Sequence, residues 1–131
     1  WGFAKLEFHD PALFRAVGDE ARAQLQEFKP QELSNLVWAF STLELSDSEL
    51  FRAVAKEAFS AMTFFKPQEM SNLVWAFAVS SVNEVGLFQA VRKEASQKAS
   101  FFKPQELSTL VWAFAKACAC DAAMCGPFVS A

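Results

Sequence analysis

FKPQELSNLVWAF, the stretch Phe28–Phe40, occurs three times in the chain with almost no change. It returns as FKPQEMSNLVWAF at Phe65–Phe77 and as FKPQELSTLVWAF at Phe102–Phe114. Successive copies start 37 residues apart. A fixed period of this size is typical of proteins built from stacked repeats. We call this stretch the repeated motif, and it predicts a repeat architecture.

The 37-residue period also organises the rest of the chain. It divides the sequence into a partial repeat at residues 1–27, complete repeats at 28–64 and 65–101, and a partial repeat at 102–131. Trp1 aligns with Trp38, and the segment 128–131 resembles the one that begins at Leu50. We therefore expect residues 1–131 to form a single helical-repeat array that is a piece of a longer array.

The first half of each repeat has the pattern of an amphipathic helix. Between Lys29 and the end of the motif region, apolar side chains recur at helical spacing, at Leu33, Leu36, Val37, Phe40 and Leu43. This spacing builds one helix face and differs from the alternation of a strand. Pro30 fits the first turn, where its missing N–H is no loss, and Glu32 suits the positive end of the helix dipole.

The second half of each repeat predicts a second helix. Asp47 to Glu49 can cap its start, and the apolar residues that follow keep helical spacing, at Leu50, Phe51, Val54, Ala55, Ala58 and Met62. Asp10 and Pro11 open the equivalent helix of the first unit as N-cap and first helical residue. Each repeat is thus predicted to be a helical hairpin that stacks on its neighbours. The predicted fold class is all-α, an α-solenoid.

A second arc of the first helix is polar and aromatic. In the first complete repeat it consists of Gln31, Asn35, Trp38 and Thr42. If this helix lines the concave groove of the solenoid, the arc presents a small polar side chain beside an aromatic one in every repeat. Amides and hydroxyls can pair with the base edges of a single strand, and successive repeats can each hold one base.

The candidate RNA-binding residues follow from this arc. The polar position is occupied by Asn35, Asn72 and Thr109. The position near the end of the helix varies most, through Lys5, Thr42, Val79 and Lys116. A lysine recurs beside each helix start and is placed to follow phosphates, at Lys29, Lys66 and Lys103.

Each of these features also has a structural interpretation. Large aromatic side chains usually serve burial, so the tryptophans can pack between adjacent helices, at Trp1, Trp38, Trp75 and Trp112. Asn35 and Asn72 can hydrogen-bond a neighbouring repeat, and the lysines can simply be solvated. The sequence leaves both interpretations open.

Composition and single residues argue against several classes of function. The net charge of −3 and the pI of about 5.2 disfavour a strongly basic nucleic-acid surface, although a local basic stripe is compatible with them. No apolar run is long enough for a membrane span. His9 is the only histidine, and no nucleophile and base recur together. We therefore expect no enzyme, no cofactor and no small-molecule substrate.

The three cysteines lie close together in the sequence, at Cys118, Cys120 and Cys125. An odd number of cysteines indicates a reducing compartment and not a disulfide framework. Three thiolates are one ligand short of a structural zinc site. We expect small buried hydrophobic residues in a loop, and no metal.

The repeated motif resembles the octotricopeptide repeat family, helical-hairpin repeats whose proline-led first helix has a Leu-Ala-Asn-x-x-Trp-Ala-like core. The matching residues are Pro30, Glu32 to Asn35, Trp38 and Ala39, with Pro67, Asn72, Trp75, Pro104, Thr109 and Trp112 in the later copies. Alanine is usual before the asparagine, whereas this chain has Ser34, Ser71 and Ser108. Related repeats, often ahead of a RAP domain, occur in algal and alveolate organellar proteins.

The resemblance implies binding of single-stranded RNA or rRNA in a mitochondrion or plastid, for transcript maturation, stability, translation or ribosome assembly. Our leading hypothesis is a non-catalytic organellar RNA-binding protein. The alternative is a protein scaffold or accessory structural subunit of a large organellar complex, which the acidic charge and the apolar ends favour. The charge of the surface lined by the first helices distinguishes the two hypotheses.

Overall fold

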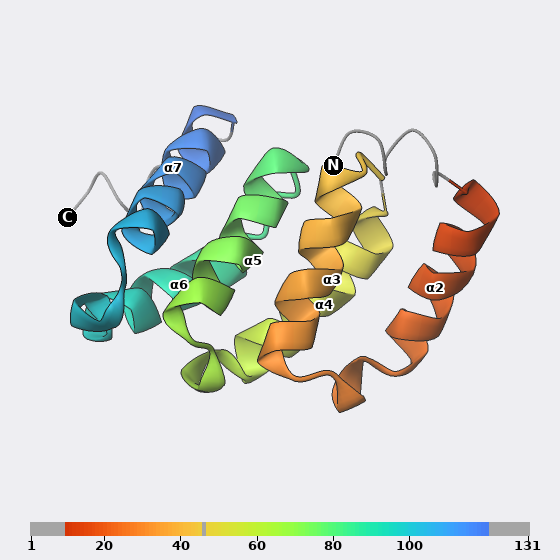
Figure 1. The fold of residues 1–131 in the computed structure, drawn as a ribbon, viewed down its shortest axis with the longest axis horizontal. Coiled ribbons are helices and arrows are strands. Elements are labelled where there is room, and N and C mark those ends of the chain that lie inside the picture. The colour runs from red at the N-terminus through yellow and green to blue at the C-terminus, as the bar shows by residue number, and fades with distance from the viewer. Residues whose placement is uncertain (1–9, 46, 121–131) are drawn as a thin grey trace.

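The protein is a row of helical hairpins (Figure 1). The computed structural model describes residues 10–45 and 47–120. Six α-helices and no strand occur within these residues, which confirms the predicted all-α class of stacked hairpins. Their bounds are α2 Pro11–Ala23, α3 Pro30–Thr42, α4 Ser48–Ser60, α5 Pro67–Val79, α6 Val85–Gln97 and α7 Pro104–Cys120. No helix in these two ranges combines the length and the hydrophobicity needed to cross a bilayer.

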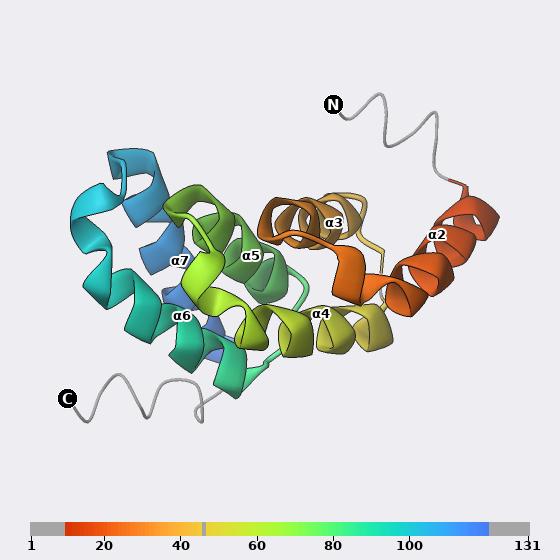
Figure 2. The ribbon, with the colours of Figure 1, turned by 90° about the horizontal axis from the view of Figure 1, so that it is seen from below.

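The helices form two layers (Figure 2). Helices α3, α5 and α7 carry the repeated motif and lie side by side, and we call them the motif layer. Helices α2, α4 and α6 form the other layer. Neighbours in the motif layer contact each other far more extensively than neighbours in the other layer do.

The start of each motif helix is fixed by the same hydrogen bond. The Glu32 side chain accepts from the backbone N–H of Lys29 at 2.9 Å, and Pro30 at the first helical position has no N–H that could be left unpaired. The equivalent bonds measure 2.9 Å at Lys66–Glu69 and 2.8 Å at Lys103–Glu106. These glutamates are therefore helix caps and do not form an acid and base pair, as predicted.

The helices of the other layer begin where the sequence predicts. The Asp10 carboxylate accepts from the backbone of Ala12 at 3.1 Å and of Leu13 at 3.2 Å. The Asp47 carboxylate accepts from the backbone of Leu50 at 3.0 Å. Both aspartates thus satisfy N–H groups that a helix start leaves unpaired.

An ion pair joins the first two helices of this layer. Arg22 of α2 donates to Asp19 in its own helix and to Glu49 of α4. The hydrogen bonds to Asp19 and Glu49 raise the pKa of the Arg22 guanidinium. This pair links α2 to α4 within the other layer.

The connections contain two features that the sequence analysis did not predict. A short 3-10 turn precedes each copy of the motif, as η1 Leu25–Glu27, η2 Met62–Phe64 and η3 Ala99–Phe101. At the other end of α3, Glu44 has a φ of 59°, and Ser81 has a φ of 58° after α5. The Leu45 N–H bonds the Phe40 carbonyl at 3.0 Å, which completes a Schellman motif in which glycine is the usual residue.

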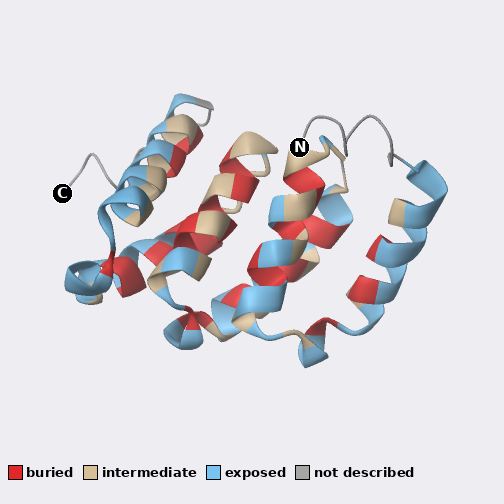
Figure 3. Cartoon of the chain, in the orientation of Figure 1, coloured by how far each residue is buried: buried red, intermediate tan, exposed pale blue. Residues whose placement is uncertain are grey.

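The first predicted arc of the motif helix forms the core between the layers (Figure 3). Leu33, Val37 and Phe40 are buried in α3, and their equivalents in α5 are buried as well. In α7 the equivalents Leu107 and Val111 are exposed. The apolar face of a motif helix is therefore covered by two neighbours, its hairpin partner and the next motif helix.

Two serines join successive motif helices. The Ser34 hydroxyl donates to the Glu69 carbonyl at 2.9 Å, and the Ser71 hydroxyl donates to the Glu106 carbonyl at 3.0 Å. Both serines are buried, whereas the third copy, Ser108, is exposed. The serine that stands where the resembling repeats have alanine thus makes the bond between repeats.

We expect Ser71→Ala to lower the free energy of unfolding by about 1 kcal/mol, because a buried hydrogen bond to Glu106 is lost with little change in volume. Urea unfolding followed by circular dichroism measures the change. Ser108→Ala is the matched control, and because this residue is exposed we expect a change within about 0.5 kcal/mol. Equal losses in the two variants would contradict the role of the serine.

Helix α7 is longer than its counterparts, with 17 residues against 13 in α5. Cys118 lies in this helix and is half-buried, so the predicted loop is wrong at this position. Alternating alanines favour continuation of the helix here. The side chain of Cys120 and all of Cys125 lie outside the described residues, so their expected burial stays a prediction. Among the described side chains no three metal-ligating groups cluster.

Candidate nucleic-acid interface

The second predicted arc of the motif helix lies on the surface of the motif layer. In α3 the side chains of Gln31, Asn35 and Trp38 are exposed and Thr42 is half-buried. The opposite arc of the same helix is in the core. The division of the helix into two faces is therefore as predicted.

Two polar depressions repeat along this surface. The first lies between α3 and α5, has a volume of about 210 Å³, and is lined by Gln31, Ser34, Asn35, Lys66, Gln68, Glu69 and Asn72. The second lies between α5 and α7, has a volume of about 200 Å³, and is lined by Gln68, Ser71, Asn72, Lys103, Gln105, Glu106 and Thr109. We call them the seam depressions. They are equivalent sites, one repeat apart.

Five of the predicted RNA-binding residues line the seam depressions: Asn35, Asn72, Thr109, Lys66 and Lys103. Each depression receives an amide from one helix, and an ammonium group and a second polar side chain from the next. The structure thus brings hydrogen-bonding groups and a cation together in each seam depression. Amides can pair with base edges, and lysines can contact phosphates.

The asparagine amides keep their hydrogen-bonding capacity. Within the described part of the chain, the side chains of Asn35 and Asn72 make no hydrogen bond, because the bond between repeats is made by Ser34 and Ser71. The alternative role of the asparagines as links between repeats therefore finds no support. Both amides line the depressions with donors and acceptors open to a ligand.

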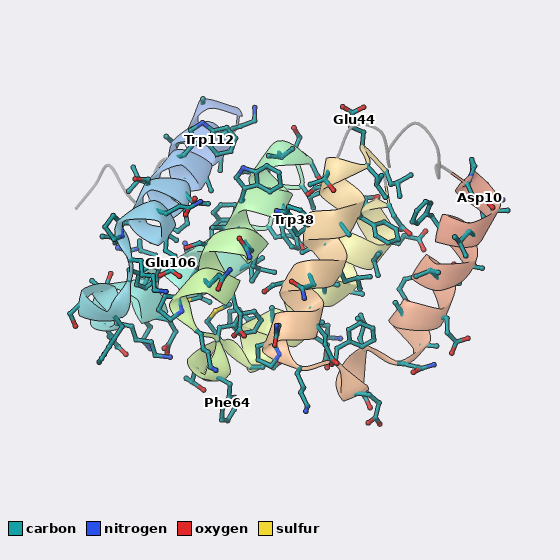
Figure 4. All side chains as sticks on the ribbon, in the orientation of Figure 1. Asp10, Trp38, Glu44, Phe64, Glu106 and Trp112 are labelled. Atoms are coloured by element: carbon teal, nitrogen blue, oxygen red, sulfur yellow. The ribbon has the colours of Figure 1, made fainter. Side chains whose placement is uncertain are left out.

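Trp38 of α3 and Trp75 of α5 pack against each other between adjacent motif helices, as their structural interpretation predicts. The ring centroids of Trp38 and Trp75 are 6.4 Å apart, with the planes tilted by 35°. Trp38 and Trp112 nevertheless remain partly exposed on the motif layer (Figure 4). Trp1 lies outside the described residues. The contact between Trp38 and Trp75 thus helps to hold α3 against α5.

Three predicted residues are not brought into the seam depressions. The Thr42 hydroxyl donates to the Ala39 carbonyl of its own helix at 2.9 Å, and Lys116 is half-buried near the other end of α7. Lys29 is exposed and lines neither of the two seam depressions. The variable position at the helix end therefore stands apart from the depressions.

The sequence analysis missed Gln68 and Gln105 as lining residues, together with the serines at the base of each seam. The available signal was the invariant Pro-Gln-Glu at all three helix starts. The polar arc includes Gln31 but does not identify Gln68 and Gln105 as lining residues, because a sequence pattern does not show which neighbouring helix a residue approaches.

The motif layer is less acidic than the chain as a whole. Its helices and the residues just before them carry four lysines and three glutamates, against a net charge of −3 for the whole chain: Lys29, Lys66, Lys103, Lys116, Glu32, Glu69 and Glu106. The three carboxylates bond backbone N–H groups at helix starts, where the dipole offsets their charge. The negative charge therefore lies elsewhere, and the lysines of the depressions face no unpaired carboxylate from their own helices.

Comparison with known proteins bears on this surface. A family model described as RNA-editing substrate-binding complex 6 protein matches residues 1–121. The match spans both seam depressions and all three copies of the motif. A search of curated proteins finds no match.

Proposed function

The chain belongs to the RNA-editing substrate-binding complex 6 protein family, and from this premise we propose that it is a non-catalytic subunit that holds single-stranded RNA along its motif layer. The observation that carries the proposal is that the seam depression recurs with the same 37-residue period as the repeated motif. Repeated sites at helical-hairpin spacing suit a repeated ligand such as a nucleotide chain.

In this proposal each seam holds one base. The amides of Asn35 and Asn72, and the hydroxyl of Thr109, contact base edges, and Lys66 and Lys103 contact phosphates. Thr42, Lys116 and Lys29 then contact the strand outside the described depressions. We propose that the repeats are of the octotricopeptide type. The proposed ligand includes rRNA, because its single-stranded regions present the same bases and phosphates.

The family also bears on compartment and partners. It favours the mitochondrion over the plastid, and an RNA-editing assembly over a ribosome. We propose that other protein subunits of that assembly contact the array and that it acts on no small molecule and needs no cofactor.

Ultraviolet crosslinking of the tagged full chain in its own cells tests the proposal. We expect crosslinked RNA, with modified peptides that include Asn35, Asn72 or Thr109, or the lysines and tryptophans beside them. A crosslink map confined to α2, α4 and α6 would contradict the placement of the RNA. A protein that is recovered in a complex without any crosslinked RNA would contradict the function.

The second candidate function, an accessory structural subunit, is favoured by the surface of α7. Val111 is 66% exposed, whereas its equivalent Val74 is fully buried by the next motif helix. Leu107 and Trp112 extend the same apolar face. Under this alternative another helical hairpin packs on α7, and the seam depressions bind no RNA. Recovery of the complex after ribonuclease treatment, without RNA crosslinks, would favour it.

A further inference from the structure

Two phenylalanines are highly exposed at the edge where the motif helices begin. Phe64 at the end of η2 is 75% exposed, and Phe101 at the end of η3 is 73% exposed. The next residue in each case, Phe65 or Phe102, is buried. Figure 4 shows Phe64 pointing away from the helices at this edge. The chain thus keeps one ring of each pair in the core and presents the other to solvent.

The turn that carries Phe64 is held by the following repeat. The Lys98 ammonium group donates to the Thr63 carbonyl at 2.8 Å and to the Phe65 carbonyl at 3.3 Å, which lie on either side of Phe64. Lys98 also pairs with Glu94 at 3.2 Å. The exposed ring is therefore carried by a tethered turn, and little conformational freedom is lost when a ligand packs on it.

Each exposed ring is tied to one seam depression. Phe64 precedes Lys66 by two residues, and Phe101 precedes Lys103 by the same distance. These lysines line the two depressions, so the ring and the lysine of each repeat are carried by one short segment of chain. Each exposed ring therefore lies two residues along the chain from the proposed RNA surface.

The surroundings of the rings favour a nucleic acid as their partner. Apart from Ala99, the exposed residues within two positions of them are polar or cationic, at Thr63, Lys66, Ser100 and Lys103. A protein-docking site would instead be expected to extend as a contiguous apolar patch. Aromatic rings interleaved with lysines are the arrangement that binds single-stranded nucleic acid, because a base stacks on the ring while its phosphate meets the cation.

We infer that Phe64 and Phe101 are stacking platforms for two bases of a single-stranded RNA whose phosphates contact Lys66 and Lys103. This inference rests on the proposed function and adds a second kind of contact to it. Stacking accepts any base, so the edge contributes affinity, while the amides in the depressions contribute discrimination. Glu27 takes the equivalent place in the first unit, where its carboxylate would repel the strand, so the platform ends there.

Binding of the full chain to a long, unstructured single-stranded RNA of mixed sequence tests the inference by fluorescence anisotropy over a range of salt concentrations. We expect Phe64→Ala with Phe101→Ala to weaken binding by about 10- to 100-fold without changing the salt dependence, because stacking releases no counterions. Phe64→Trp with Phe101→Trp should bind at least as well as the unmodified chain. Phe59→Ala, which removes an exposed ring from α4, is the matched control and should have no effect.

The outcomes separate this inference from the proposed function. If the double alanine variant binds RNA like the unmodified chain, the platforms do not exist, although RNA binding itself stands. If the unmodified chain binds no RNA, the proposed function fails first. If the double variant keeps RNA binding but loses a copurifying protein subunit, the edge is a protein-docking site and the inference is overturned.

Discussion

Phe77→Ala is expected to lower the free energy of unfolding by about 3–5 kcal/mol. Phe77 is 0% exposed and lies in α5, the central motif helix. Its ring meets that of Phe51 in α4 with the centroids 5.1 Å apart and the planes at 65°. Alanine removes this edge-to-face contact and leaves a cavity between the layers that the flanking helices cannot easily fill.

The matched control is Phe64→Ala, which makes the same chemical change at a ring that is 75% exposed. We expect this variant to unfold within about 0.5 kcal/mol of the unmodified chain. Urea unfolding of the full chain, followed by circular dichroism, measures both. Because each repeat contacts only its neighbours, Phe77→Ala should also broaden the transition as α2–α4 and α6–α7 lose their connection. Similar losses from the two variants would contradict the assignment of the core.

The fold was predictable because its main determinant is a pattern within the chain. Leu33, Val37 and Phe40 recur at helical spacing and again one repeat later, and burial follows from that spacing alone. The turn at Glu44 was not predictable in the same way, because its positive φ occurs without the glycine that normally marks it. The hydrogen bonds from Glu44 to Ser41 and from Leu45 to Phe40 hold the turn in place of the glycine.

The candidate site was predictable in its residues but not in its geometry. The polar arc through Asn35 identified the exposed face of the helix. The Ser34 hydroxyl, however, donates to the backbone carbonyl of Glu69 in the next repeat. A pattern of residue types does not show where backbone carbonyls lie. For the same reason the sequence did not show that Lys66 lines one depression together with Asn35 of the preceding helix.

Lys66→Ala with Lys103→Ala is expected to weaken binding to single-stranded RNA by roughly 10- to 30-fold near 0.1 M salt, because each lysine in a seam depression neutralises one phosphate. The slope of log affinity against log salt should fall in magnitude by about 1.4, since each contact to a single strand contributes about 0.7. Fluorescence anisotropy with the full chain measures both quantities.

Lys56→Ala with Lys93→Ala removes the same charge from exposed positions on α4 and α6 and is the matched control. If the RNA lies on the motif layer, this control should keep nearly the whole salt slope, because α4 and α6 lie in the other layer. Equal losses in the two double variants would mean that net charge and not position governs binding. The chain would then attract RNA without directing it into the depressions, and the repeated asparagines would have no part in selecting a base.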